Sequence, residues 1–246
     1  GPGNQIIMKT LRPVMQAVFQ LQAQPWGGDC SVPQFIHTYN PNDGRLQDTW
    51  YMGPQVTPQG DTVITLIDSL INIDQAGGNP FSFGYAIGKY QVAPGATSNA
   101  SNDFPVFRYA DIFMMKAECL LRTGQPDEAA TLVTEVRQRA FKNNPALATV
   151  SGAQLALGSS YDYGYVQDGK IVTDEGGGDV KYGRFLDELG WEFAAEAHRR
   201  QDIIRFDVYS TKMWFQHKPV GTYTQLFPIA ADVLATNPNL KQNPGY

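Results

Sequence analysis

One helical pattern, residues 107–141, constrains the fold of this chain more than any other feature. The stretch reads FRYADIFMMKAECLLRTGQPDEAATLVTEVRQRAF and is interrupted only at TGQP. Gly124 predicts the end of a first helix, and Pro126 predicts the start of a second, where a missing N–H loses no hydrogen bond. Asp127 and Glu128 then lie in a first turn, where the helix dipole favours acidic groups. The stretch therefore predicts an antiparallel helical hairpin.

The hairpin also fits the tetratricopeptide pattern, a repeat of about 34 residues. Phe113 and Leu120 fall on large positions, and Ala117 and Ala129 fall on the small positions where two helices approach closely. Only one good copy is found, although such repeats need neighbours to bury their outer faces. Either degenerate copies lie elsewhere in the sequence, or the partner repeats lie outside it.

The region before the hairpin has a different character. Residues 1–25 mix a helix-like stretch with AVFQLQA, which predicts a short strand at 17–23. Residues 25–102 are rich in Gly, Pro, Asn and aromatic residues, so long regular elements are not expected there. Within them, a period of two predicts a strand with one aromatic face, formed by Phe81, Phe83, Tyr85 and Ile87.

Two further elements are predicted after the hairpin. Asp168-Gly169 between apolar runs is typical of a type I′ turn and predicts a β-hairpin. Residues 184–206 predict one long helix, because apolar side chains recur at helical spacing at Leu189, Phe193, Ala197 and Ile204. The predicted fold class is mainly α, with a tetratricopeptide-like hairpin, loop-rich excursions and short β-hairpins.

Composition excludes several classes of function. A net charge of −5 over 246 residues provides no basic surface for nucleic acid. No apolar run is long enough to span a bilayer. Cys30 and Cys119 allow one disulfide at most, and the apolar helical pattern around Cys119 favours a buried thiol.

The sequence contains no metal-binding motif, and no cofactor is expected. The three histidines, His37, His198 and His217, are scattered and do not form a zinc motif. Four acidic residues would suit a calcium ion if they gathered in space: Asp168, Asp174, Glu175 and Asp179. An acidic surface loop is the simpler interpretation, and calcium is left open.

The strongest charged constellation lies within residues 184–206. Glu188, Glu192 and Glu196 step by four, and four more charged residues follow them: Arg199, Arg200, Asp202 and Arg205. Paired carboxylates could serve a glycoside hydrolase, but a general acid needs a raised pKa, and neighbouring arginines keep carboxylates ionised. Structural ion pairing with these arginines is therefore the favoured interpretation.

Aromatic residues are the remaining candidates for a binding site. Irregular, polar sequence carries Trp26, Phe35, Tyr39, Trp50 and Tyr51. Aromatic faces stack on sugar rings, and the Asp, Asn, Gln and Arg side chains nearby could bind hydroxyl groups. The competing interpretation is that these rings form the local core of a loop-rich region.

Three stretches, in this order, resemble the hallmarks of the SusD/RagB family. The first carries Arg108, Tyr109, Glu118, Arg137 and Arg139. The second carries Glu188, Glu192, Glu196, Arg199, Asp202 and Arg205. The third is the tail, from LFPI at 226–229 to NPNLKQNPGY at 237–246, and FIHTYNPNDGRL at 35–46 also resembles a family segment.

This resemblance implies that residues 1–246 are the C-terminal part of a single SusD-like domain, with a loop-rich, aromatic-rich region at 1–104 and a helical region at 105–246. It implies non-catalytic capture of nutrients, most often oligosaccharides and in some relatives peptides, at the surface of a Gram-negative cell. A lipidated N-terminal cysteine, outside this sequence, would anchor the protein to the outer membrane. Its partner would be a SusC-like TonB-dependent barrel.

Two alternatives stay open beside nutrient capture. The chain could be an interaction scaffold that docks the transporter while the N-terminal half contacts the ligand, or a glycoside hydrolase that uses Glu192 and Glu196. The family hallmarks are scaffold motifs, so they assign no ligand-binding residue. In the tail, Leu240 and Tyr246 are expected to pin the last residues against the body of the fold.

Overall fold

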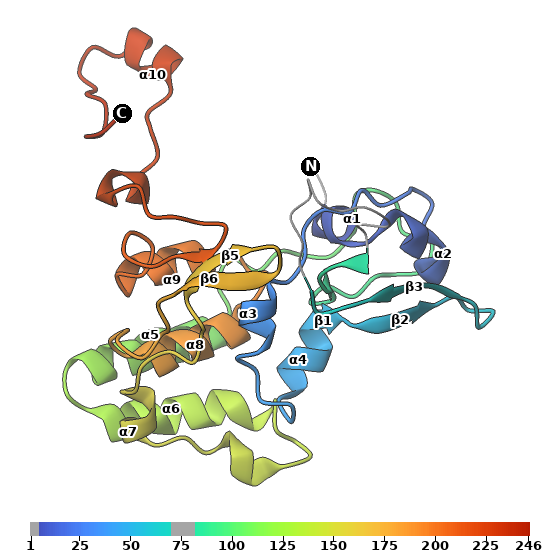
Figure 1. The fold of residues 1–246 in the computed structure, drawn as a ribbon, viewed down its shortest axis with the longest axis horizontal. Helices are drawn as coiled ribbons and strands as arrows, with labels where there is room; N and C mark the ends of the chain where they lie inside the picture. The colour runs from blue at the N-terminus through green and yellow to red at the C-terminus, as the bar shows by residue number, and fades with distance from the viewer. Residues whose placement is uncertain (1–4, 70–81) are drawn as a thin grey trace.

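The computed structural model describes residues 5–69 and 82–246 (Figure 1). Its α-helices are α1 (Ile6–Thr10), α2 (Gln16–Phe19), α3 (Pro33–Ile36), α4 (Gly44–Thr49), α5 (Tyr109–Arg122), α6 (Pro126–Gln138), α7 (Gly152–Leu155), α8 (Gly183–Glu192), α9 (Arg199–Arg205) and α10 (Ala231–Thr236). Short 3-10 helices are η1 (Pro13–Met15), η4 (Pro145–Ala148) and η5 (Thr222–Gln225). The mainly α fold class is confirmed.

The strands are short and form three small sheets. They are β1 (Trp50–Tyr51), β2 (Gly53–Val56), β3 (Thr62–Leu66), β4 (Ala86–Ile87), β5 (Gly164–Gln167), β6 (Lys170–Asp174) and β7 (Trp214–Phe215). Strand β1 pairs with β4 and β2 pairs with β3, both antiparallel. In the third sheet β5 lies between antiparallel β6 and parallel β7.

The central hairpin forms as the sequence predicts. Helix α5 ends before Gly124, whose φ of 83° places it in the left-handed region that glycine tolerates. Helix α6 begins at Pro126, in the first helical position. Ala117 and Ala129 are fully buried where the two helices meet, so the small positions of the repeat do allow close packing.

The predicted turn at Asp168-Gly169 is also confirmed. Asp168 has a φ of 53° and Gly169 a φ of 72°, the pair of positive values that a type I′ turn requires. The turn joins β5 to β6, with Gln167 opposite Lys170 in the antiparallel register.

The prediction of one long helix over residues 184–206 was wrong, because the chain forms α8 and α9 with a break between them. Ala195 and Ala197 both have a φ of 63°, which an α-helix cannot contain. The Glu192 carbonyl, at the end of α8, accepts hydrogen bonds from Lys89 at 2.9 Å and Arg108 at 2.9 Å. These distant cations satisfy the helix end and favour the break.

Two strand predictions in the first half also need correction. The AVFQLQA segment begins with helix α2, not a strand, because short apolar runs do not distinguish the two. The aromatic strand is reduced to β4, Ala86–Ile87, while Phe83 forms an isolated bridge with Ile67. Phe81 lies outside the described residues.

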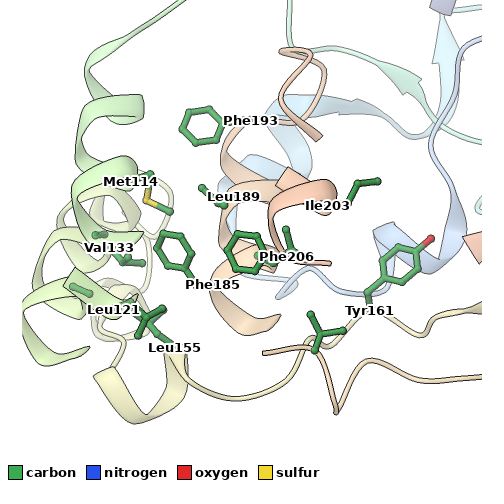
Figure 2. Close-up of a cluster of buried hydrophobic side chains, with 14 of the residues drawn as sticks. Met114, Leu121, Val133, Leu155, Tyr161, Phe185, Leu189, Phe193, Ile203 and Phe206 are labelled. Carbon is green, nitrogen blue, oxygen red and sulfur yellow. The ribbon is translucent and has the colours of Figure 1, made fainter. Parts of the chain in front are cut away.

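The interior contains two hydrophobic clusters. One gathers side chains from α5, α6 and α8 that point toward one another (Figure 2), including Met114, Val133 and Phe185. The other joins α1, β3 and β4 through Ile7, Leu66 and neighbouring residues. In Figure 1 the helical part and the part around β2 and β3 lie side by side.

The outer face of α5 is apolar and exposed. Tyr109 is 75% exposed, Ile112 is 55% exposed and Met115 is 46% exposed. Cys119 lies exposed on the same helix, so the prediction of a buried thiol was wrong: position 119 falls outside the buried stripe of Met114, Ala117 and Leu121. An uncovered outer face agrees with the single copy of the repeat found in the sequence.

The C-terminal tail does not pack against the body, contrary to the sequence-based expectation. Leu240 is 39% exposed and Tyr246 is 47% exposed, and the segment that carries α10 projects from the helical part (Figure 1). Instead, the tail folds back on the preceding segment: the Tyr246 hydroxyl donates to Leu226 at 2.9 Å, and Gln242 exchanges two hydrogen bonds with Ile229. Gln242 and Tyr246 therefore hold the end of the chain to the segment that contains Leu226 and Ile229, and not to the body of the fold.

Deletion of residues 237–246 is expected to change the stability of the chain little. The lost contacts are part-buried or exposed hydrogen bonds and one ring pair between Tyr223 and Tyr246, so the melting temperature should fall by no more than about 2–4 °C. Differential scanning calorimetry of the truncated chain measures this change. A fall of more than about 10 °C would mean that the tail stabilises the body.

Candidate functional site

A buried charged cluster surrounds the end of α8. Glu188 is 2% exposed and Glu192 is fully buried. Arg45, from α4, lies between them, with Nη2 3.3 Å from Glu188 Oε2 and Nη1 3.4 Å from Glu192 Oε2. Asp43 caps the N-terminus of α4 and holds the same guanidinium, with Oδ2 2.6 Å from Arg45 Nη2. Both carboxylates therefore meet a cation that the sequence places more than 140 residues earlier.

Further cations reach the cluster from α5, α6 and the β4 loop. Arg108 binds Glu192 with Nη1 at 2.7 Å and Glu196 with Nε at 2.6 Å. Lys89 Nζ lies 2.7 Å from Glu196 Oε1. Arg137 pairs with Glu188, and Arg139 pairs with Glu192. Structural ion pairing of the glutamates, predicted from the sequence, is thus what the structure contains.

The partners of these glutamates are not the arginines that the sequence suggested. Arg199 donates to the Leu186 carbonyl, and Arg200 donates to the carbonyls of Thr224 and Gln225. Arg205 pairs with Glu118 at 2.8 Å and with Asp202 at 2.9 Å. The break between α8 and α9 turns this second group of charges away from the first.

The charged environment sets the protonation of the two buried glutamates. Burial alone would raise the pKa of Glu192, but Arg139, Arg45 and Arg108 together hold it below its ordinary value. At Glu188, burial outweighs Arg45 and Arg137 and raises the pKa, contrary to the expectation that neighbouring arginines keep these carboxylates ionised. Both side chains are engaged by arginines, so neither is a free proton donor to a bound substrate.

The five aromatic candidates do not form one platform. Trp26 is 52% exposed. Tyr39 and Trp50 are buried, and Phe35 packs edge-on against both, at centroid distances of 5.3 Å and 6.3 Å. Tyr51 packs on Phe19 at 5.3 Å. Trp26 is the candidate whose ring face is most open to a ligand from solution.

A cavity of about 380 Å³ lies between α3, α8, α9 and β7. Phe35 and Trp50 line it, together with residues that the sequence did not single out as ligand contacts, among them Tyr163 and Trp214. The sequence carried no signal for these two, because their positions depend on the pairing of β5 with β7.

The other predicted residues take structural positions. Tyr109 stands exposed at the start of α5 and packs edge-on against Phe113. Glu118 joins α5 to α9 through Arg205 and also pairs with Arg122 at 2.9 Å. Among the described residues, no three acidic, histidine or cysteine side chains are placed to share a metal ion. Asp179, from the calcium hypothesis, pairs with Lys212 at 2.7 Å.

Arg45 and Asp43 are central to the charged cluster, although the sequence reasoning did not place them in it. Their segment, NDGRL, was noted only as similar to a family stretch. Gly44 between them donates its N–H to the Ala140 carbonyl at 2.8 Å, and a Cβ there would lie 2.9 Å from that oxygen. The segment therefore docks α4 directly on the end of α6.

Comparison with known proteins connects this architecture to one family. Residues 29–246 match the model of the SusD family. The chain belongs to the SusD family. Among curated members, it is 30% identical over 159 residues to the SusD-like protein P25 of Formosa agariphila, covering 60% of this chain and 26% of that protein. It is 25% identical over 152 residues to the starch-binding protein SusD of Bacteroides thetaiotaomicron, covering 58% and 22%.

Solved structures of SusD-type proteins share the fold. A SusD-like protein of Bacteroides fragilis superposes with a TM-score of 0.64 at 15% identity, covering 99% of this chain and 51% of that one. Surface glycan-binding protein A of Bacteroides thetaiotaomicron superposes with a TM-score of 0.60 at 16% identity, covering 98% and 47%. The chain spans about a quarter of the length of the curated relatives it matches.

In the described part of the chain, no helix has the length and apolar character that a bilayer crossing requires.

Proposed function

We propose that this chain is part of a protein that captures oligosaccharides without cleaving them. Membership of the SusD family supports this function, and two similar proteins are named for binding starch and surface glycans. The observation that carries the non-catalytic part is the charged cluster: Glu188, Glu192 and Glu196 are all engaged by basic side chains. A retaining or inverting hydrolase needs carboxyl groups that face the scissile bond.

The cellular setting belongs to the same proposal. The protein is anchored by a lipid to the outer membrane, faces the cell exterior and passes its ligand to a SusC-like TonB-dependent barrel. Family membership is the support for this setting. A peptide is the second ligand class to be tested, because the sequence resemblance includes relatives that bind peptides.

Trp26 is the first residue to test as a ligand contact. Its half-exposed indole offers a flat apolar face, and such a face stacks on the C–H groups of a sugar ring. Trp26→Ala is expected to weaken binding of a neutral oligosaccharide such as maltoheptaose about fivefold or more, the equivalent of about 1 kcal/mol. Isothermal titration calorimetry measures the affinity.

Tyr109→Ala is the matched control, since Tyr109 is also an exposed aromatic residue but lies on α5. The control is expected to bind as the parent chain does. Equal affinities for the parent chain and Trp26→Ala, across a panel of oligosaccharides and peptides, would remove Trp26 from the site.

A scaffold role is the second candidate function, and the exposed apolar face of α5 favours it. In that case the chain would be retained by the SusC-like barrel in a pull-down experiment and would bind no oligosaccharide in calorimetry. Binding of an oligosaccharide by the chain alone would instead favour capture.

A further inference from the structure

The cavity between α3, α8, α9 and β7 carries polar groups that the charged cluster does not use. Its volume of about 380 Å³ lies within the range of small-molecule sites. Most of its wall is apolar and aromatic, with rings from Phe35, Trp50, Tyr161 and Trp214. In Figure 2, Tyr161 and Ile203, two wall residues, lie on the side of the cluster away from Leu121.

Two wall residues hold buried polar atoms that lack a hydrogen-bond partner within the described chain. They are the hydroxyl of Tyr163 and Oδ2 of Asp202. Tyr163 is 2% exposed and Asp202 is 3% exposed, so solvent at the surface does not reach them. A buried polar atom without a partner is costly, and a ligand or an ordered water would relieve that cost.

The electrostatics of the cavity favour a neutral ligand. Asp202 Oδ1 already pairs with Arg205 at 2.9 Å, and Arg199 lines the same cavity. Burial raises the pKa of Asp202 although both arginines oppose that shift. A cationic ligand would meet Arg199 in the wall of the cavity, whereas a hydroxyl group can donate to Oδ2 or accept from Tyr163.

We propose that this cavity binds a neutral, hydroxylated ring compound of monosaccharide size. The aromatic walls would cover the faces of the ring, while Tyr163 and Asp202 bind hydroxyl groups at its edge. Trp26 is not among the residues that line this cavity, so the site does not depend on the proposed capture of oligosaccharides.

Two residues indicate how the cavity can be probed from solution. Ala197, between α8 and α9, is an exposed wall residue and marks the rim. Cys30 also lines the cavity and is half-buried. Burial raises the pKa of the Cys30 thiol, so its alkylation is best followed at mildly alkaline pH.

The experiment measures alkylation of both cysteines by iodoacetamide, with peptide mass spectrometry, in the presence of D-glucose, D-galactose or N-acetyl-D-glucosamine. Small ligands of this kind bind in the millimolar range. At about 50 mM of a sugar that binds, Cys30 should react about fivefold or more slowly. Exposed Cys119 is the internal control, and its rate should stay unchanged. Glycerol at the same concentration controls for the co-solvent.

Tyr163→Phe separates a ligand site from a general effect of sugar on the protein. The Tyr163 hydroxyl makes no hydrogen bond of good geometry in the described chain and has the Ser159 side chain as a polar neighbour. Its removal should therefore change the melting temperature little, while protection of Cys30 should be lost. Tyr165→Phe, two residues further along the chain, in β5 and outside the cavity, is the matched control and should keep the protection.

Three results would overturn the proposal. In the first, none of the three sugars slows the reaction of Cys30. In the second, Tyr163→Phe retains the full protection, which would place the sugar elsewhere. In the third, glycerol protects Cys30 as well as the sugars do, which would mean that the cavity selects no ring. None of these results bears on whether Trp26 contacts an oligosaccharide.

Discussion

Arg45→Ala is expected to lower the free energy of unfolding by about 3–5 kcal/mol, because it leaves buried carboxylates without their shared cation. Arg45 is 7% exposed and binds Asp43, Glu188 and Glu192 at once. Burial works to lower the pKa of Arg45, but Glu188 and Asp43 outweigh burial and raise it. Removing the guanidinium would leave three acidic groups close together around α8. Urea denaturation followed by circular dichroism measures the change.

Arg122→Ala is the matched control for this prediction. Arg122 also pairs with a glutamate, Glu118, at 2.9 Å, but its side chain is 38% exposed. Exposed pairs contribute little, so the control should lose no more than about 1 kcal/mol. Equal losses in the two variants would contradict the central structural role of Arg45.

Trp50→Ala is expected to destabilise the chain by about 3–5 kcal/mol, the usual cost of removing a buried large aromatic side chain. The Trp50 ring is buried against Phe35, and its Nε1 lies 3.5 Å from the Tyr39 hydroxyl. Trp26→Ala, in contrast, should change the free energy of unfolding by about 0.5 kcal/mol or less, because its ring is half exposed. Thermal or urea denaturation distinguishes the two tryptophans.

The difference in burial between Trp50 and Trp26 also decides which of the two variants is a clean test of ligand binding. A loss of binding in Trp50→Ala can follow from a damaged core, whereas a loss in Trp26→Ala reports the ligand contact itself. If Trp50→Ala were as stable as the parent chain, the burial of this ring in solution would be contradicted.

The sequence predicted the parts of the fold that depend on local signals. Gly124 and Pro126 define the ends of α5 and α6 through backbone conformations that only a few residues favour. Asp168-Gly169 defines its turn in the same way. Each of these signals lies within a few residues of the structure it specifies, so no tertiary information was needed.

Predictions that depended on distant contacts were less successful. The break after Glu192 requires Lys89 and Arg108, which reach the end of α8 from other elements. The charge pattern of residues 188–196 correctly indicated ion pairs, but the partner arginines come from α4, α5 and α6. Spacing along one helix cannot reveal such partners.

The candidate site also depends on contacts between residues that are distant in the sequence. Composition identified an aromatic-rich segment, but it could not separate exposed Trp26 from buried Trp50 and Tyr39. The cavity was not predicted, because its walls join α3 with α9 and β7, which lie more than 160 residues apart. The unpartnered hydroxyl of Tyr163 can be recognised only when the fold has placed it among those walls.

The function we propose for the protein of which this chain is part is to bind oligosaccharides and to release them intact. Calorimetric titration with a panel that includes maltoheptaose, followed by chromatography of the recovered sugar, tests it most directly. We expect saturable binding to at least one oligosaccharide and recovery of that oligosaccharide at its full length. Shortened products that disappear in Glu192→Gln would contradict the claim and identify a glycoside hydrolase.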